Sequence, residues 1–263
     1  MRAGQGVRGM NDLGKTINKF FGLQHPHHKI LEIFTEFDLR GKVLDAGAGP
    51  GVISSKLKAI GLDVYAADIS PGLFTAKGID CIKVDLDQQM PYEDGFFDCV
   101  LSSNLIEHLE DQYTFIRECY RVLRERGKLV VTTPNVLNLK ARLANLLVGF
   151  NLFTGRPQNE VDPFEGGEHI NMVNYYELRV NLHRNGFRII HCSTHCFSNT
   201  ALMLFWLSPL IYLFTYRGFK RERGFKQVER NREIFRHVLS ADMLFGKKLF
   251  VVAEKDPTYV KRR

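Results

Sequence analysis

The segment with the clearest chemistry is an acidic residue followed by three alternating glycines, in the order Asp45-Ala46-Gly47-Ala48-Gly49-Pro50-Gly51. Glycine lets the backbone turn tightly and approach a ligand closely, and the helix expected after it offers unpaired N–H groups at its start. Asp68 stands 17 residues after Gly51, at the end of the next apolar stretch. A carboxylate in that place can accept hydrogen bonds from both hydroxyls of a ribose. We therefore expect a nucleoside cofactor to bind across the ends of these two stretches.

The spacing of the glycines distinguishes two kinds of nucleoside cofactor. Dinucleotide-binding proteins typically show G-x-G-x-x-G, whereas this chain has G-x-G-x-G, with Val52 at the sixth position. Asp45, placed inside the preceding strand, also departs from the dinucleotide pattern. An NAD(P)-dependent oxidoreductase is therefore the less favoured interpretation, and it stays open.

Short β-rich runs alternate with helical runs on both sides of this turn. We expect strands over 42–46, 62–67, 79–84, 97–102, 128–132, 187–192 and 248–253. We expect helices over 25–39, 51–60, 71–77, 105–124, 139–150 and 174–184. Repeated strand–helix units imply a parallel sheet with helices on both faces. The predicted fold class is therefore α/β, with a doubly wound, Rossmann-like sheet.

The 263 residues fit one large domain with insertions. We expect 1–24 to be a disordered or loosely packed segment that is no signal peptide, because it has no apolar core. The domain itself is expected over 25–263, with a substrate-side lid at 138–170. An apolar and basic insertion at 196–245 separates the last two strands.

Five segments resemble, in order, the motifs of the class I S-adenosylmethionine-dependent methyltransferases, of the small-molecule type that includes the ubiquinone-biosynthesis enzymes. They are the glycine turn, VYAADI at 64–69, VDL at 84–86, FFDCVLSSNLIEHL at 96–109 and GKLVVTTP at 127–134. His169, the run YEL at 176–178 and the pair GF at 186–187 resemble the family's substrate-side helix and sixth strand. The resemblance covers 38–195 and 245–255.

The resemblance implies a seven-stranded sheet in the order 3-2-1-4-5-7-6 with its last strand antiparallel, and S-adenosyl-L-methionine as the cofactor. Asp68 would hold the ribose, and Asp85 would contact the adenine amino group. Asn104 and Leu105 would lie beside the methionine half. The implied cofactor-binding residues are Asp45, Gly47, Ala48, Gly49, Gly51, Asp68, Ile69, Asp85, Leu86, Asn104 and Leu105.

Methyl transfer mainly requires that the enzyme align the acceptor and exclude water. A hydroxyl acceptor also benefits from a general base, for which the candidate catalytic residues are Glu107, His108 and His169. His108 is also interpreted as a residue that closes the cofactor pocket, and His169 follows the flexible pair Gly166-Gly167. By resemblance we expect O-methylation of a quinone precursor, or of an envelope glycan or lipid-linked sugar. A modified tRNA base is a less favoured acceptor.

Five cysteines without a C-x-x-C pair fit reduced thiols and a cytoplasmic setting. Two histidines and two cysteines stand together in His191-Cys192-Ser193-Thr194-His195-Cys196. Side chains alternate between the two faces of a strand, so these four would not converge on one ion. We therefore expect no metal site.

An uncharged run over 201–216, ALMLFWLSPLIYLFTY, precedes a basic stretch over 217–236 with eight Lys or Arg and three Glu. The run is short for a spanning helix of ~20 residues, and a span would separate two strands of one sheet. An apolar stretch beside a polybasic one is typical of interfacial anchoring. We expect peripheral contact with the inner membrane face through 201–236. An internal cap over the active site and a surface for a partner protein are the alternatives.

Nucleic-acid binding is not expected, although the net charge is +7. The aromatic and basic residues of the insertion are adjacent rather than interleaved, and no RNA-binding module is visible. A function of another class stays open, namely a non-catalytic protein that keeps the cofactor fold and binds a membrane or a partner through the insertion. It predicts a retained fold without turnover.

Overall fold

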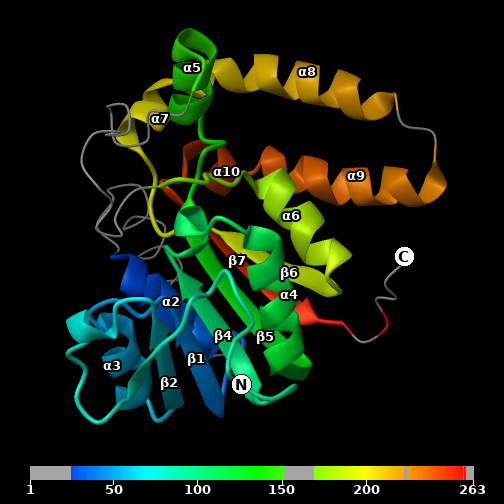
Figure 1. Ribbon diagram of the computed structural model, residues 1–263. Coiled ribbons are helices and arrows are strands. Elements are labelled where there is room, and N and C mark those ends of the chain that lie inside the picture. Colours follow the sequence, from blue (N-terminus) through cyan, green and yellow to red (C-terminus); the bar gives the residue numbers. More distant parts are fainter. Residues whose placement is uncertain (1–24, 151–168, 222–223, 257, 259–263) are drawn as a thin grey trace, which may run out of the picture.

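A seven-stranded sheet is the centre of the chain in the computed structural model, which describes residues 25–150, 169–221, 224–256 and 258 (Figure 1). The expected N-terminal segment 1–24, the pair Gly166-Gly167 and much of the expected lid lie outside the described residues. The strands are β1 (Lys42–Ala46), β2 (Asp63–Asp68), β3 (Cys81–Lys83), β4 (Phe97–Ser103), β5 (Leu123–Pro134), β6 (Phe187–Ser193) and β7 (Lys248–Lys255).

The strand order is β3-β2-β1-β4-β5-β7-β6. The pairs from β3 across to β5 are parallel, and β7 runs antiparallel to both β5 and β6. The expected fold class and strand order are thus confirmed. Because the first five strands are parallel, their carboxyl ends meet at one edge of the sheet, where open α/β sheets bind ligands.

Helices cover both faces of the sheet, and further helices lie beyond its carboxyl edge (Figure 1). On the faces are α2 (Pro26–Glu36), α3 (Val52–Ala59), α4 (Gln112–Val122) and α6 (Tyr175–Arg184), with the 3₁₀ turns η1 (Pro71–Leu73) and η2 (Ile106–His108) in the connections. The elements beyond the edge, which we call the cap, are α5 (Leu139–Val148), α7 (Asn199–Met203), η3 (Phe205–Leu207), α8 (Ser208–Lys220), α9 (Phe225–Val238) and α10 (Ala241–Phe245).

The core has one hydrophobic layer on each face of the sheet. On one face Phe115 of α4 and Leu182 of α6 pack with Val100 of β4. On the other face Phe34 of α2 and Leu57 of α3 belong to a second cluster. The alternation of side chains along each strand feeds both layers, which is why the strands read as nearly continuous apolar runs.

Two expected helices differ from the structure. The helix expected over 105–124 is divided into η2 and α4, because Leu109 is extended and Asp111 begins a new helix as its N-cap. The Asp111 carboxylate accepts hydrogen bonds from the N–H groups of Tyr113 and Thr114. The helix expected over 71–77 is only the 3₁₀ turn η1, which ends at Leu73.

The cap has a small core of its own. Leu139 of α5, Ala201 of α7 and Leu244 of α10 are buried together, and Ile211 of α8 packs against them. Helix α9 is docked on α6 through the Arg179–Glu233 ion pair, with an N···O distance of 2.7 Å, and through a hydrogen bond between Tyr175 and His237. In the part of the chain that the structure describes, no helix combines the length and the apolar character needed to cross a membrane.

Candidate functional site

The glycine turn joins β1 to α3 at the carboxyl edge of the sheet. The N–H groups of Gly47 and Ala48 donate to the carbonyl of Ala67 at N···O distances of 2.8 and 3.2 Å. Gly47 has a φ of +73°, and a Cβ at this position would lie 2.8 Å from Leu105 Cδ1. At Gly49 a Cβ would meet no described atom within 4 Å. The turn is therefore tightly packed on the Leu105 side and open at Gly49, where a ligand can approach the backbone.

Asp45 ties the turn to the helix that follows it. The residue is 0% exposed, and its Oδ2 accepts a hydrogen bond from the Ser54 hydroxyl in α3. Burial raises the pKa of Asp45 to about 6, although the hydrogen bond from Ser54 acts in the opposite direction. Its other oxygen, Oδ1, has no hydrogen-bond partner among the described residues. Gly51 is buried and is the N-cap of α3, where it has no side chain to occupy the helix start.

Asp68 lies at the end of β2, beside β1. Its Oδ2 accepts a hydrogen bond from the Gly49 N–H and its Oδ1 accepts one from the Ser70 N–H, both at 2.8 Å. A carboxylate has about four acceptor positions. Two hydrogen bonds thus hold the side chain in place, and the remaining lone pairs are available to a ligand.

The remaining residues implied for the adenosine lie along the same edge. Ile69, directly after β2, leaves 59% of its surface exposed. Asp85 is exposed just beyond β3, and its Oδ1 accepts a hydrogen bond from the Asp87 N–H at 3.0 Å. Leu86, which follows it, is buried in the core. The order β3-β2-β1-β4 thus places these residues on one side of the glycine turn, with Asn104 and Leu105 on the other.

Lys248 joins the candidate site although no motif of the sequence indicates it. Its Nζ donates to Asn104 Oδ1 at 2.7 Å, across 144 positions of the chain. Asn104 follows β4 with a φ of +53° and is held by a hydrogen bond from its N–H to the Thr132 carbonyl at 3.0 Å. Burial lowers the pKa of Lys248, and Glu107 acts against that change. The first residue of an antiparallel strand lies at the carboxyl edge of its parallel neighbours. The position of Lys248 at the start of the last strand could therefore have indicated that it lies near the site.

The three candidate catalytic residues lie together beyond β4 and β5. His169 Nε2 is 3.9 Å from Glu107 Oε1, and the ring centroids of His108 and His169 are 4.9 Å apart. The Glu107 side chain is 0% exposed, and neither of its carboxylate oxygens accepts a hydrogen bond from a described residue. Burial raises the pKa of Glu107. The structure therefore brings together two imidazoles and a buried carboxyl group.

Asn171 fastens the segment that carries His169 to η2. Its N–H donates to the Glu107 carbonyl at 3.0 Å, and its side-chain amide donates to the carbonyls of Leu109 and Glu110. Gln112 Nε2 bonds both the Ile106 and the Asn171 carbonyls, at 2.8 and 2.6 Å. No local sequence pattern indicates Asn171 or Gln112, because a side-chain amide bonded to distant carbonyls leaves none.

The same three candidate residues have the spacing of metal ligands. One donor atom from each of Glu107, His108 and His169 lies within 4.8 Å of the others, and imidazole and carboxylate are common ligands of divalent cations. The expectation of no metal therefore stays a prediction that requires a test. Within the described ranges, His191, Cys192, His195 and Cys196 do not form such a group.

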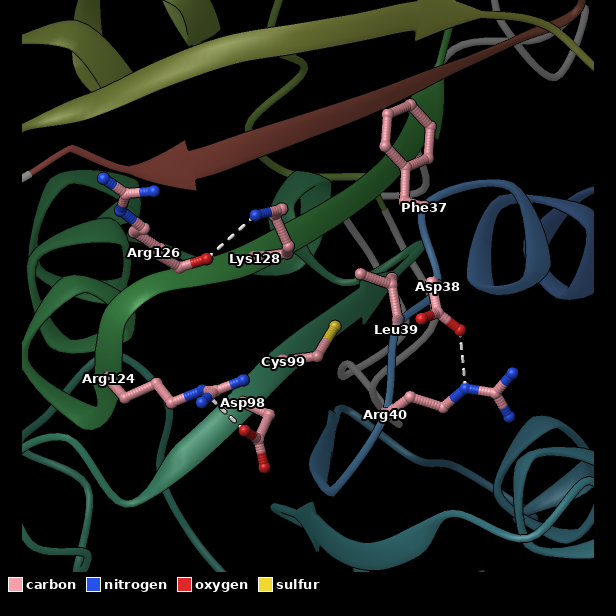
Figure 2. A pocket seen from close by; sticks show the side chains of 9 residues that line it. All are labelled: Phe37, Asp38, Leu39, Arg40, Asp98, Cys99, Arg124, Arg126 and Lys128. Carbon is pink, nitrogen blue, oxygen red and sulfur yellow. Dashed lines mark hydrogen bonds and ion pairs between the residues drawn. The ribbon is translucent and has the colours of Figure 1, made fainter.

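A separate small pocket lies at the opposite, amino edge of the sheet (Figure 2). Its volume is about 90 Å³, and its lining includes Asp98 and Cys99 from the start of β4 and Lys128 from the start of the parallel part of β5. The Arg40–Asp38 and Arg124–Asp98 ion pairs border it, at N···O distances of 2.7 and 2.5 Å. Because the pocket lies at the far edge from the glycine turn, it takes no part in the candidate site.

Sequence comparisons agree with this geometry. Residues 44–131 match a family model described as a methyltransferase domain. A ubiquinone biosynthesis O-methyltransferase of Xanthomonas oryzae pv. oryzae is 30% identical over 129 residues, which are 43% of this chain and 54% of that protein. The mitochondrial ubiquinone biosynthesis O-methyltransferase of Bos taurus is 31% identical over 114 residues, 39% of this chain and 31% of that protein. The chain thus spans about half the length, or less, of these curated relatives.

Solved structures of other proteins share this fold. A methyltransferase from Archaeoglobus fulgidus, described as dependent on S-adenosylmethionine, superimposes with a TM-score of 0.56 at 18% identity. The superposition covers 87% of this chain and 92% of that one. At this level of identity the likeness establishes the fold, and it leaves the acceptor undefined.

Proposed function

We propose that the chain is a class I S-adenosylmethionine-dependent methyltransferase and that it transfers a methyl group from S-adenosyl-L-methionine to an oxygen of a small or lipid-linked acceptor. Two findings support this: residues 44–131 match a family model described as a methyltransferase domain, and the strand order is the one that the resemblance implies. The observation that carries the proposal is that Leu105 links the glycine turn to the segment with the candidate catalytic residues. Gly47 of the glycine turn packs against Leu105, and η2, which carries Glu107 and His108, begins at the next residue of the chain.

The residues at the carboxyl edge fit this cofactor. The backbone is open at Gly49, Asp68 has acceptor positions beyond its two hydrogen bonds, and Asp45 Oδ1 is buried with no hydrogen-bond partner among the described residues. Asp68 would hold the ribose hydroxyls, and Asp85 would accept from the adenine amino group. When bound, S-adenosylmethionine supplies a methyl group on a positively charged sulfur, which makes it a strong electrophile.

The group around Glu107 supports proton transfer from an acceptor hydroxyl. An imidazole is the side chain best suited to accept a proton near neutral pH. In our proposal His169 or His108 accepts the hydroxyl proton, and the Glu107 carboxyl group orients the His169 ring at 3.9 Å. Asn171 keeps the two segments in register.

Two observations favour the acceptor class. The curated relatives cited above are named as O-methyltransferases of ubiquinone biosynthesis, which supports a phenolic quinone precursor. The cap of this chain carries many exposed apolar side chains beyond the site, which supports a lipid-linked acceptor, and a lipid-linked envelope sugar would share that property.

The first experiment is a calorimetric titration of the full chain with S-adenosylhomocysteine, with NADH as a parallel control. We expect micromolar binding of S-adenosylhomocysteine alone, because the glycine turn lacks the dinucleotide spacing. Binding of NADH alone would replace the proposal with an oxidoreductase. Binding of neither would favour the non-catalytic alternative, in which the fold persists without cofactor chemistry.

The second experiment tests the proposed base with the variant His169→Asn and the control His28→Asn, which changes an exposed histidine of α2. Methyl transfer from labelled cofactor to simple phenols and lipid-linked sugars should fall by about 10²–10⁴-fold for His169→Asn, with unchanged affinity for S-adenosylhomocysteine. Raising the pH should restore part of the rate, because the acceptor then ionises without a base.

Dialysis against a chelator, followed by Mg²⁺ or Zn²⁺, separates a metal role for Glu107, His108 and His169 from the proposed base. Loss of the rate on dialysis and its return with the ion would overturn a metal-free mechanism.

A further inference from the structure

Two segments of the cap that are more than 50 positions apart expose large apolar side chains. On α5 the exposed fraction reaches 81% at Leu146 and 73% at Leu147. On α7 and η3 it reaches 76% at Met203 and 64% at Trp206, and on α8 it is 63% at Phe214. Exposed apolar surface gathered in this way commonly marks an interaction site.

These segments belong to one surface. Helices α5 and α7 and the first half of α8 meet in the small core of Leu139, Ala201, Leu204 and Ile211. Figure 1 shows α5 beside α7, and α8 continuing from them along the outside of the cap. We call the exposed apolar residues of these elements the α5–α8 face: Leu146, Leu147, Val148, Met203, Phe205, Trp206, Leu210, Leu213 and Phe214.

The attachment of α8 leaves this surface uncovered. Tyr212, Tyr216 and Phe219 direct their rings to Phe235 of α9, with centroid distances of 5.4, 6.5 and 6.3 Å. No residue of α8 is fully buried. The aromatic side of α8 therefore holds it on α9, and Ile211 holds its first half on the small core. Leu210, Leu213 and Phe214 remain 52%, 41% and 63% exposed.

The exposed side of α8 changes from apolar to basic along its length. Leu210, Leu213, Phe214, Arg217 and Arg221 follow the spacing i, i+3, i+4, i+7 and i+11, which places them on one side of a helix. No acidic residue occurs in α8, and the stretch 217–236 carries a surplus of five positive charges. A surface of apolar and aromatic side chains that ends in arginines complements an anionic lipid surface.

We propose that the α5–α8 face docks the protein on an anionic membrane surface, with α8 lying in the plane of the lipid headgroups. The apolar residues would enter the acyl boundary, and Arg217 and Arg221 would meet lipid phosphates. A second copy of the chain is a poorer occupant, because the arginines of α8 would find no acidic residue on the same helix of the copy. Helix α5 begins a few residues after β5 ends, so the docked face lies on the side of the sheet that carries the candidate site. This last point rests on the proposed function, whereas the docking itself does not.

The single tryptophan of the chain gives a direct readout. Trp206 belongs to the α5–α8 face, so its fluorescence should shift to the blue when the full chain meets phosphatidylcholine vesicles that contain phosphatidylglycerol. Flotation of the same samples measures binding. We expect strong flotation with these vesicles, weak flotation with phosphatidylcholine alone, and a decrease as salt is raised.

Two double variants separate the contributions of the face. Arg217→Gln/Arg221→Gln should lower binding to the anionic vesicles by roughly fivefold per charge removed, since a basic residue near such a surface contributes about 1 kcal/mol. Leu213→Glu/Phe214→Glu should abolish binding to both kinds of vesicle. The matched controls are Arg117→Gln/Arg184→Gln and Ile60→Glu, which change exposed residues away from the face and should float like the unaltered chain.

Two results would overturn the docking. One is equal flotation of the face variants and the controls, with no shift in Trp206 fluorescence. The other is a dimer in light scattering that Leu213→Glu/Phe214→Glu dissociates without any effect of lipid, which would assign the face to a second copy. Titration of every variant with S-adenosylhomocysteine reports the fold separately. If the unaltered chain floats but fails to bind that ligand, the proposed function fails and the docking stands.

Discussion

At the scale of single residues, the Asp68 carboxylate combines two tasks. It holds the glycine turn through the Gly49 N–H and its own loop through the Ser70 N–H. The Gly49 backbone to which it is bonded is open, since a Cβ there would meet no described atom within 4 Å. A fixed carboxylate is a good partner for ribose hydroxyls, because its orientation is settled before the ligand arrives.

We expect Asp68→Ala to weaken the binding of S-adenosylhomocysteine by roughly 10–100-fold, since hydrogen bonds to a charged group contribute about 1.5–3 kcal/mol. Calorimetric titration measures the change. The matched control is Asp63→Ala, an exposed aspartate at the start of the same strand, which should bind like the unaltered chain. Unchanged affinity in Asp68→Ala would place the ribose elsewhere.

Asp45 offers a prediction about pH. Its pKa in the folded chain is raised by burial from 3.8 to about 6. The folded state therefore keeps a proton that the unfolded state has lost, and the stabilisation from this group is fully present below pH 3.8 and is lost as the pH rises through about 6. The shift corresponds to about 3 kcal/mol of unfolding free energy between acid and neutral pH.

The variant Asp45→Asn removes this titration. The unfolding free energy of the unaltered chain minus that of the variant should fall by a few kcal/mol between pH 4 and pH 7, as about 1.4 kcal/mol accompanies each unit of pKa shift. Denaturant unfolding at several pH values gives both curves, and Asp63→Asn serves as the control for an exposed aspartate. A constant difference across this range would show that Asp45 is ionised in the folded chain at all these pH values.

At the scale of elements, the break between η2 and α4 determines where the candidate base lies. In a continuous helix over 105–124, the directions of the Glu107 and His108 side chains would be set by the axis of α4. The extended Leu109 and the Asp111 cap instead place Glu107 and His108 in a separate turn. The antiparallel β7 acts in a comparable way, because it delivers Lys248 to Asn104 at 2.7 Å.

We expect Asp111→Ala to lower the unfolding free energy by about 0.5–2 kcal/mol, the usual contribution of an N-cap. The reason is the loss of the hydrogen bonds from the N–H groups of Tyr113 and Thr114. Denaturant unfolding measures it, and Asp111→Asn, which retains an acceptor, should recover most of the stability. Equal loss in both variants would show that charge rather than capping holds the start of α4.

At the scale of the whole molecule, one sheet connects the glycine turn, the candidate base and the cap. The order β3-β2-β1-β4 brings together the residues proposed for the adenosine, and β4-β5-β7 brings together Asn104, Thr132 and Lys248. A ligand that contacts several strand ends stabilises the folded chain as a unit, because it binds the folded state and not the unfolded one.

S-adenosylhomocysteine at a concentration of 100 times its Kd should therefore stabilise the fold by about 2.7 kcal/mol. For a chain of this size that corresponds to a rise in Tm of roughly 5–8 °C. A thermal scan measures it, with NADH at the same concentration as the control. Equal shifts with both compounds would contradict a site specific for S-adenosylmethionine.

The sequence by itself determined the sheet and the glycine turn. Strand alternation, the turn from Asp45 to Gly51 and the acid at Asp68 are local patterns, and each is set by backbone geometry within a few residues. The strand order followed from the resemblance and is confirmed by the pairing. The helix expected over 105–124 was wrong, because helical periodicity continues through 109–111 while the cap of Asp111 interrupts the backbone.

Only the tertiary structure decided which distant residues meet. His169 comes within 3.9 Å of Glu107, and Lys248 reaches Asn104, because chain segments 62 and 144 positions apart converge at one edge of the sheet. The α5–α8 face likewise depends on packing. Leu139 of α5 is buried against Ala201 of α7, and this contact decides which side of α5 remains exposed. Local propensity fixes turns and strands, whereas the burial of one segment against another fixes which side chains remain exposed or face a ligand.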